Sequence, residues 1–146
     1  MIRELGPGDG AVLTAVWTAV QPDLDIGAWP ADGPEAFLAT PANFALAAFV
    51  DGTAAGLAWG VDIRRPSGST MTYLHQLDVH PTYRRQGVAT DLVRAAMAGA
   101  QRRGSAQFWL STGGHNTVAQ ALYERLGGDR KELGDVNYWW DLGSPG

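Results

Sequence analysis

The residues from Arg84 to Thr90 could bind an anion at the start of a helix. Arg84 and Arg85 are followed by Gly87 and Ala89, whose small side chains let a phosphate approach the main chain closely. The first amides of a helix have no partner inside it, and the helix dipole favours negative charge there. The two arginines would add charge-assisted hydrogen bonds. The alternative is an ordinary loop-to-helix junction with solvated arginines.

The same turn lacks the residues of two common nucleotide sites. No Gly-Lys-Ser/Thr follows it, so it is not a Walker loop, and the three glycines of the dinucleotide fingerprint are missing. The sequence therefore argues against ATP, GTP and NAD as ligands of this turn.

Two motifs in the chain resemble those of the GNAT N-acetyltransferases. The first is Arg84-Arg85-Gln86-Gly87-Val88-Ala89, preceded by Leu77-Asp78-Val79-His80-Pro81, and the second comprises Asn116, Ala119, Ala121-Leu122-Tyr123 and Leu126-Gly127. The pair is more specific than either motif alone, and the resemblance covers roughly residues 44–142. It implies direct transfer of an acetyl group from acetyl-CoA to a primary amine.

The resemblance also assigns cofactor contacts. Leu77 and Val79 would present backbone groups to the pantetheine arm, while the turn would hold the diphosphate and a later helix would flank the thioester. The residues expected to bind acetyl-CoA are Leu77, Val79, Arg84, Arg85, Gln86, Gly87, Val88, Ala89, Thr90, Asn116, Ala119 and Tyr123.

Acyl transfer needs a group that protonates the departing thiolate and a group that deprotonates the amine. Tyr123 is the predicted general acid, since it lies two helical turns after Asn116 on the same face; the alternative is a core tyrosine. His75 is the preferred base because its ordinary pKa lies near neutrality. Asp78 is the rival, and a water chain is the third option. The three histidines, which include His80, lack metal-ligand spacing and give no case for a metal.

The sequence most resembles the aminoglycoside 3-N-acetyltransferases of the gentamicin and fortimicin type, through Phe44–Phe49, the anion turn and Ala121–Tyr123. It departs from them in two places: the loop Thr112–Thr117 has no carboxylate, and Gln76 replaces a strand Asp. The predicted substrate contacts are Asp25, Trp29, Asp78 and His115. Another small amine, a protein N-terminus or lysine, a noncatalytic acyl-CoA-binding domain and a nucleotide-binding protein remain alternatives.

These residues must be positioned by a mixed α/β fold. Strands are predicted at Ile2–Leu5, Phe44–Val50, Ala54–Ile63, Thr70–Val79, Ala106–Thr112, Lys131–Leu133 and Asn137–Leu142, the last two as an antiparallel pair. Helices are predicted at Gly10–Val20, Pro34–Ala39, Gly87–Arg103 and Thr117–Leu126, with a loop over residues 21–34. Alternation places Met71, Tyr73, His75, Leu77 and Val79 on one strand face, and Thr70, Thr72, Leu74, Gln76 and Asp78 on the other.

The resemblance implies a single GNAT domain over residues 1–146, built on a mixed, largely antiparallel sheet of six to seven strands flanked by helices. Its central strands would splay, so that the cofactor arm enters the gap between Thr70–Val79 and Phe108–Thr112.

Composition limits the partners. The chain has 146 residues, no cysteine and a net charge of −4, which disfavours nucleic acid and suits a cationic substrate. With no signal peptide and no apolar run long enough to span a membrane, a cytoplasmic protein is expected. The aromatic segment Asn137–Trp140 is expected to be core, a substrate wall or the contact of a homodimer. Residues 143–146 are expected to be a mobile tail.

Overall fold

The structure is a computed structural model that describes residues 1–132, 134 and 136–143. The chain forms two compact parts, Met1–Ser111 and Thr112–Gly146, and each is considered by itself. The predictions for Leu133 and for tail residues 144–146 lie outside the described residues.

The first part contains one mixed sheet. Its strands are β1 (Ile2–Leu5), β2 (Asn43–Val50), β3 (Thr53–Arg64), β4 (Thr70–Val79) and β5 (Gln107–Leu110), in the spatial order β1-β2-β3-β4-β5. The first three pairs are antiparallel and β4 pairs with β5 in parallel. The predicted mixed α/β fold is confirmed, but the described residues form five strands, not six or seven.

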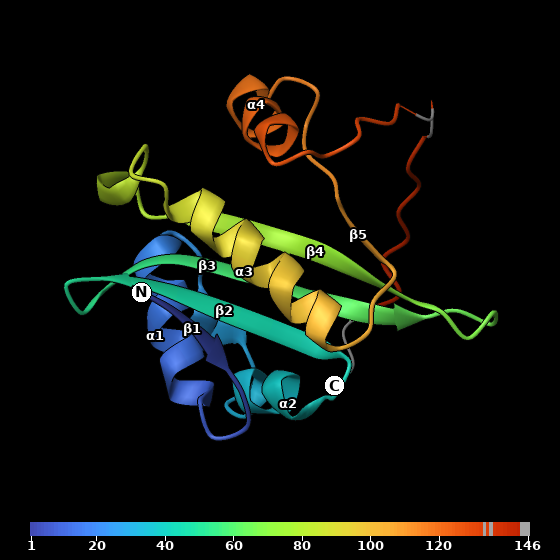
Figure 1. Ribbon diagram of the computed structural model, residues 1–146. Helices are drawn as coiled ribbons and strands as arrows, with labels where there is room; N and C mark the ends of the chain where they lie inside the picture. The colour runs from blue at the N-terminus through green and yellow to red at the C-terminus, as the bar shows by residue number, and fades with distance from the viewer. Residues whose placement is uncertain (133, 135, 144–146) are drawn as a thin grey trace. The chain divides into compact units, whose positions relative to one another are not determined.

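Helices cover both faces of this sheet (Figure 1). α1 (Gly10–Val20) and α2 (Gly33–Ala39) pack on one face, whereas α3 (Val88–Arg102) packs on the other. α1 buries Leu13, Val16 and Val20 against the sheet, which is the apolar spacing that predicted it. Two 3-10 turns, η1 (Ile26–Ala28) and η2 (Pro81–Tyr83), lie in the connecting loops.

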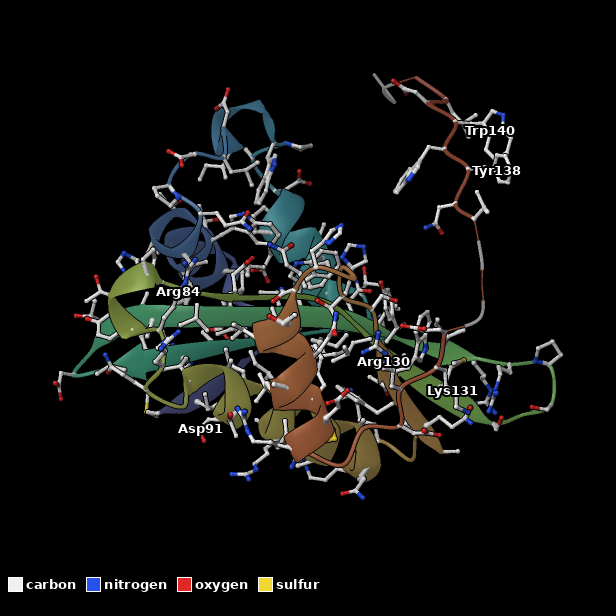
Figure 2. The ribbon with its side chains drawn as sticks, turned by 90° about the horizontal axis from the view of Figure 1, so that it is seen from above. Arg84, Asp91, Arg130, Lys131, Tyr138 and Trp140 are labelled. Atoms are coloured by element: carbon white, nitrogen blue, oxygen red, sulfur yellow. The ribbon has the colours of Figure 1, made fainter. Side chains whose placement is uncertain are left out.

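The second part contains α4 (Thr117–Arg125) followed by irregular chain. The predicted antiparallel pair is wrong for its described residues, because Lys131, Glu132 and Asn137–Leu142 form no strand. A strand needs a neighbour for its backbone groups, and these residues pair with no other segment of the described chain. Tyr138 and Trp140 are exposed and lie 6.1 Å apart between ring centroids (Figure 2).

A β-bulge interrupts β4 at His75. Trp59 pairs with Gln76, but the next residue of β3, Gly60, pairs with Leu74, so His75 is the extra residue. The Trp59 ring stacks on the His75 ring at 4.5 Å and donates a 2.7 Å hydrogen bond to Gln76. His75 and Gln76 therefore share a face, and the prediction that they lie on opposite faces is wrong.

Beyond the bulge, the side chains of β4 divide between the two helical layers. Gln21, which follows α1, donates a hydrogen bond to Asp78, so Asp78 faces α1. A Cβ on Gly56 would lie 2.9 Å from Leu92 and 3.1 Å from Val88, two side chains of α3. Because Gly56 pairs with Val79 across the strands, the Val79 side chain also faces α3. The bulge thus puts His75 and Asp78 on one face and separates both from Val79.

A polar cluster joins the end of α3 to the sheet. Asp62 accepts hydrogen bonds from Arg103 Nε at 2.6 Å and from the Thr72 hydroxyl at 2.7 Å. Burial alone would raise the pKa of Asp62, but the hydrogen bonds from Arg103 and Thr72 and the charge of Arg103 lower it overall. The ionised Asp62 therefore stabilises the fold.

Replacing Asp62 by asparagine is expected to lower the free energy of unfolding by about 1 kcal/mol at pH 7, a modest value because solvent screens part of the pair. Since the folded pKa is below the ordinary 3.8, this stabilisation is complete above pH 3.8 and is lost as pH falls through the folded pKa. Urea unfolding at pH 7 and pH 3 measures the difference. Glu4→Gln is the control, because Glu4 is half exposed and its ion pairs are 3.6 and 3.9 Å long. An equal loss in both variants would contradict the assignment.

The described residues contain neither a membrane span nor a metal cluster. None of the helices there is long and apolar enough to cross a membrane. In the same residues, no three histidine, aspartate or glutamate side chains gather at a distance that could hold a metal ion.

Candidate functional site

The start of α3 has the geometry of an anion-binding turn. Arg85 and Gly87 both have positive φ, 63° and 83°, and Gly87 is the residue before the helix. The amide of Asp91 donates to the Gly87 carbonyl at 3.0 Å and closes the first helical turn. The amides before Asp91 therefore have no carbonyl inside the helix and are available to an acceptor outside it.

The side chains around this turn leave it open. Arg84 and Asp91 mark it in Figure 2. Arg84 Nε donates to the Val79 carbonyl at 3.3 Å, Arg85 is exposed, and Gln86 bonds the Thr82 carbonyl at 3.1 Å. A Cβ on Gly87 would meet no atom within 4 Å. An anion could thus approach the backbone directly.

The edge of β4 next to this turn has unpaired backbone groups. The pairing of β4 with β5 stops at Leu74 and Leu110, while β4 continues to Val79. The His80 amide donates to a β3 carbonyl at 2.8 Å, and backbone direction alternates along a strand. Leu77 and Val79 therefore direct their N–H and C=O groups to the side where β5 has ended. This backbone arrangement is the one that the family resemblance implies for the pantetheine arm.

A polar cluster occupies the opposite, α1 side of β4. Asp78 Oδ2 accepts hydrogen bonds from Gln21 Nε2 at 2.7 Å and Gln76 Nε2 at 2.5 Å. Trp59 Nε1 donates to Gln76 Oε1 at 2.7 Å. His75 is exposed and its ring stacks on that of Trp59. The structure thus places both predicted bases, His75 and Asp78, around the same indole.

Both predicted N-terminal contacts, Asp25 and Trp29, have partners within the first part of the chain. Asp25 accepts a hydrogen bond from the Gly27 amide and caps η1. Trp29 packs edge-on against Trp17 of α1 at 5.0 Å. Glu35, a further acid of this region, accepts hydrogen bonds from two amides at the start of α1, at 2.5 and 2.8 Å, and is therefore structural.

The remaining predicted residues lie in the second part. Asn116 caps α4 by accepting a hydrogen bond from the Ala119 amide at 3.1 Å. Tyr123 is half-buried on α4, and burial raises its pKa, so the phenol keeps its proton at neutral pH. His115 is exposed in the preceding loop.

No pattern in the sequence predicts a functional role for Gln21, Trp59 or Gln76. Gln21 reaches Asp78 across 57 residues, and no local pattern signals such a contact. Trp59 and Gln76 are a cross-strand pair that the hairpin register could have suggested, but the bulge hides that register in the sequence.

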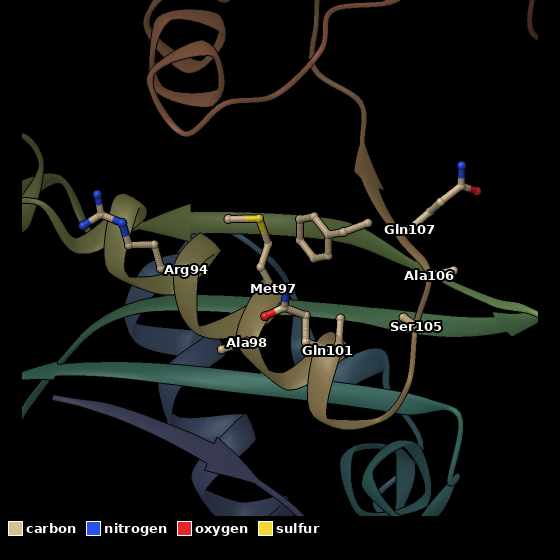
Figure 3. A pocket seen from close by; sticks show the side chains of 9 residues that line it. Arg94, Met97, Ala98, Gln101, Ser105, Ala106 and Gln107 are labelled. Atoms are coloured by element: carbon tan, nitrogen blue, oxygen red, sulfur yellow. The ribbon is translucent and has the colours of Figure 1, made fainter.

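A hollow of about 400 Å³ lies between the second half of α3 and the start of β5 (Figure 3). Its lining mixes apolar Met97 and Phe108 with polar Arg94 and Gln101. None of the predicted site residues lines it, so it is distinct from the anion turn.

Comparison with known proteins agrees with this geometry. The sequence profile of the Acetyltransferase (GNAT) family matches residues 13–128. N-alpha-acetyltransferase 30 of Schizosaccharomyces pombe is 37% identical over 67 residues, which are 45% of this chain and only 43% of that protein.

Solved structures share the fold. An aminoglycoside acetyltransferase from an uncultured soil metagenomic sample has a TM-score of 0.86 at 14% identity in its trehalose complex, over 98% of this chain and 96% of that one. Its sisomicin complex has a TM-score of 0.83 at 13% identity, over the same shares of the two chains. Aminoglycoside N-acetyltransferase AAC(6')-Iy with CoA has a TM-score of 0.76 at 23% identity, over 98% and 100%.

The predicted superfamily is therefore confirmed by the family profile, which spans most of the chain and includes the anion turn. The chain belongs to the GNAT acetyltransferase family, whose acetyl donor is acetyl-CoA.

Proposed function

We propose that this chain transfers the acetyl group of acetyl-CoA to a primary amine by direct attack in a ternary complex. The observation that carries the proposal is the pairing of two features in the first part. The open amides at the start of α3 suit a diphosphate. The Leu77 backbone and the Val79 N–H, which face the side where β5 has ended, suit the amide-bearing arm attached to it. The family profile supports the same donor.

Each step of the transfer has a group in this chain. The amides from Arg85 to Thr90 and the arginine side chains hold the diphosphate, and the Val79 amide polarises the thioester carbonyl. His75 or Asp78 takes a proton from the bound ammonium, and the resulting neutral amine attacks the thioester carbonyl. A C–N bond forms, the nitrogen loses its second proton, and the C–S bond breaks to release the thiolate. Tyr123 then gives its proton to the thiolate. The acetylated amine and free CoA are the products.

An aminoglycoside is the leading acceptor. The chain is acidic overall, and Asp78 and Trp29 offer a carboxylate and an aromatic ring of the kinds that bind amino sugars. Aminoglycoside acetyltransferases that are 14% and 23% identical to this chain share its fold. Sequence identities this low show the fold and not the substrate. The sequence points to the 3-amino group, while AAC(6')-Iy bears the 6′ designation. The position acetylated is therefore part of the test.

A protein N-terminus is the second candidate. The observation that favours it is the 37% identity to N-alpha-acetyltransferase 30, which is confined to 67 residues. Such an acceptor carries one ammonium group and a peptide backbone, whereas an aminoglycoside carries several ammonium groups.

An amine panel tests the proposed function. The purified protein is incubated with acetyl-CoA and one amine: sisomicin, neamine, spermidine or a peptide with an N-terminal alanine. Release of free CoA is followed with a thiol reagent. We expect turnover with sisomicin or neamine, and NMR of the product locates the acetyl group. If the protein binds acetyl-CoA in calorimetry but acetylates no amine of the panel, it is a binding module and the proposed enzymatic function is wrong.

A further inference from the structure

One carboxylate oxygen of Asp78 accepts two hydrogen bonds, and the other accepts none from the described residues. Oδ2 accepts both glutamine amides, from Gln21 and Gln76, whereas Oδ1 makes no hydrogen bond within the described part of the chain. No arginine or lysine of that part forms an ion pair with this carboxylate. Only neutral amides therefore donate hydrogen bonds to the Asp78 carboxylate. The carboxylate can still accept a hydrogen bond from a cation.

Trp59 fixes the direction of this arrangement. An indole N–H only donates, so the atom of Gln76 that it contacts must be the carbonyl Oε1. The Gln76 amide nitrogen is consequently turned toward Asp78 Oδ2. The second amide, from Gln21, fixes the same oxygen from the end of α1. The carboxylate is thus anchored from two sides through Oδ2, while Oδ1 has no hydrogen-bond partner in the described residues.

The position of Asp78 also suits an acceptor. Its side chain lies on the α1 face of β4, and the backbone of its neighbours Leu77 and Val79 runs along the unpaired edge. The bulge places His75 on the same face as Asp78, with its ring against Trp59. A group bound at Oδ1 would therefore sit beside the strand segment to which the donor is assigned.

We propose that Asp78 binds the ammonium group of the acceptor through Oδ1, with Gln76 and Trp59 as positioning residues. This inference rests on the proposed acetyl transfer and specifies its substrate as a cationic amine. An ammonium offers three N–H donors and a full charge, so the hydrogen bond to a carboxylate is charge-assisted. Trp59 acts on Asp78 through Gln76, by keeping the amide that orients Asp78 in one rotamer.

Three variants test the proposal, with the panel amine of highest kcat/KM as the probe. Asp78→Asn keeps the shape and removes the charge, and is expected to raise the KM for the amine about 10- to 100-fold with kcat changed much less. Trp59→Phe keeps a ring and removes the indole N–H, and is expected to raise the same KM about 5-fold. Gln76→Met removes the hydrogen bonds to Trp59 and Asp78 without shrinking the side chain. It should raise the KM for the amine about as much as Trp59→Phe does. The affinity for acetyl-CoA, measured by calorimetry, should not change.

Trp17→Phe is the matched control. Trp17 lies in the same aromatic cluster, 6.2 Å from Trp59 between ring centroids, but its buried indole N–H has no hydrogen-bond partner in the described chain. The control should lose stability as Trp59→Phe does and leave the KM for the amine within about twofold. If both tryptophan variants raise that KM equally, the positioning role is wrong.

Failure of the Asp78 proposal can be told apart from failure of the proposed acetyl transfer. If the wild type is active and Asp78→Asn leaves the KM for the amine unchanged, the ammonium does not bind Asp78, while the proposed function stands. If kcat collapses and the KM stays constant, Asp78 is a base and not an anchor. If the wild type acetylates no amine, sisomicin binding to the CoA-loaded protein is measured by calorimetry instead, and equal binding by wild type and Asp78→Asn overturns the proposal.

Discussion

Replacing Gly87 by alanine should weaken the binding of CoA about 10- to 100-fold. Gly87 has a φ of 83°, and a Cβ there would project into open space at the start of α3. If a diphosphate occupies that space, the methyl group lengthens its hydrogen bonds to the amides, each of which is worth about 1.5–3 kcal/mol when one partner is charged. Calorimetry with CoA and wild-type or variant protein measures the change.

A second glycine separates this effect from backbone strain. Gly68, in the turn between β3 and β4, has a φ of 89°, and a methyl group there would likewise meet no atom within 4 Å. Alanine costs about 1 kcal/mol of stability at either site, because both residues are left-handed. Gly68→Ala should therefore lose the same stability and keep its affinity for CoA. Equal affinities in the two variants would exclude Gly87 from the cofactor site.

The parts of the fold that local chemistry dictates were predictable. The dipeptide Asp51-Gly52 predicts a tight hairpin between β2 and β3, and both residues have positive φ, 49° and 77°, as that turn requires. The apolar stripe and following Gly104 predict α3 to within a residue at each end. Each of these signals lies within a few residues of the element that it specifies.

The candidate site was predictable only where it is local. The turn before α3 is a contiguous motif, so its open amides and left-handed Gly87 follow from the sequence. The contacts of Asp78 depend on Gln21 and on a bulge at His75, and both arise from tertiary packing. A single extra residue in β4 reversed the faces of all side chains after it, which strict alternation cannot anticipate.

The terminal segment shows a different limit. Asn137–Leu142 has the aromatic composition of a strand, but composition does not supply the neighbour that a strand must pair with. Its aromatic side chains are exposed in the structure. The β-propensity of these residues therefore led to a wrong prediction, since Asn137–Leu142 form no strand.

Replacing Tyr123 by phenylalanine should lower kcat about 100-fold or more and leave the binding of acetyl-CoA unchanged. The removed hydroxyl is the proposed proton donor to the thiolate, and general-acid catalysis typically contributes that much. Burial raises the pKa of Tyr123 above its ordinary 10.0, so the wild type keeps a protonated phenol across neutral pH. On the alkaline side its kcat should fall as pH rises through that raised pKa, and Tyr123→Phe should lack this decline.

Tyr138→Phe is the matched control, because it removes a hydroxyl from an exposed tyrosine of the same part of the chain. It should keep the wild-type kcat and pH profile. The competing interpretation makes Tyr123 a packing residue beside the buried Leu122 of α4. On that interpretation Tyr123→Phe would alter the melting temperature and leave kcat within a few-fold. A full kcat in Tyr123→Phe would therefore remove the general acid from the mechanism, while the anion turn and the acceptor carboxylate would still be tested by their own variants.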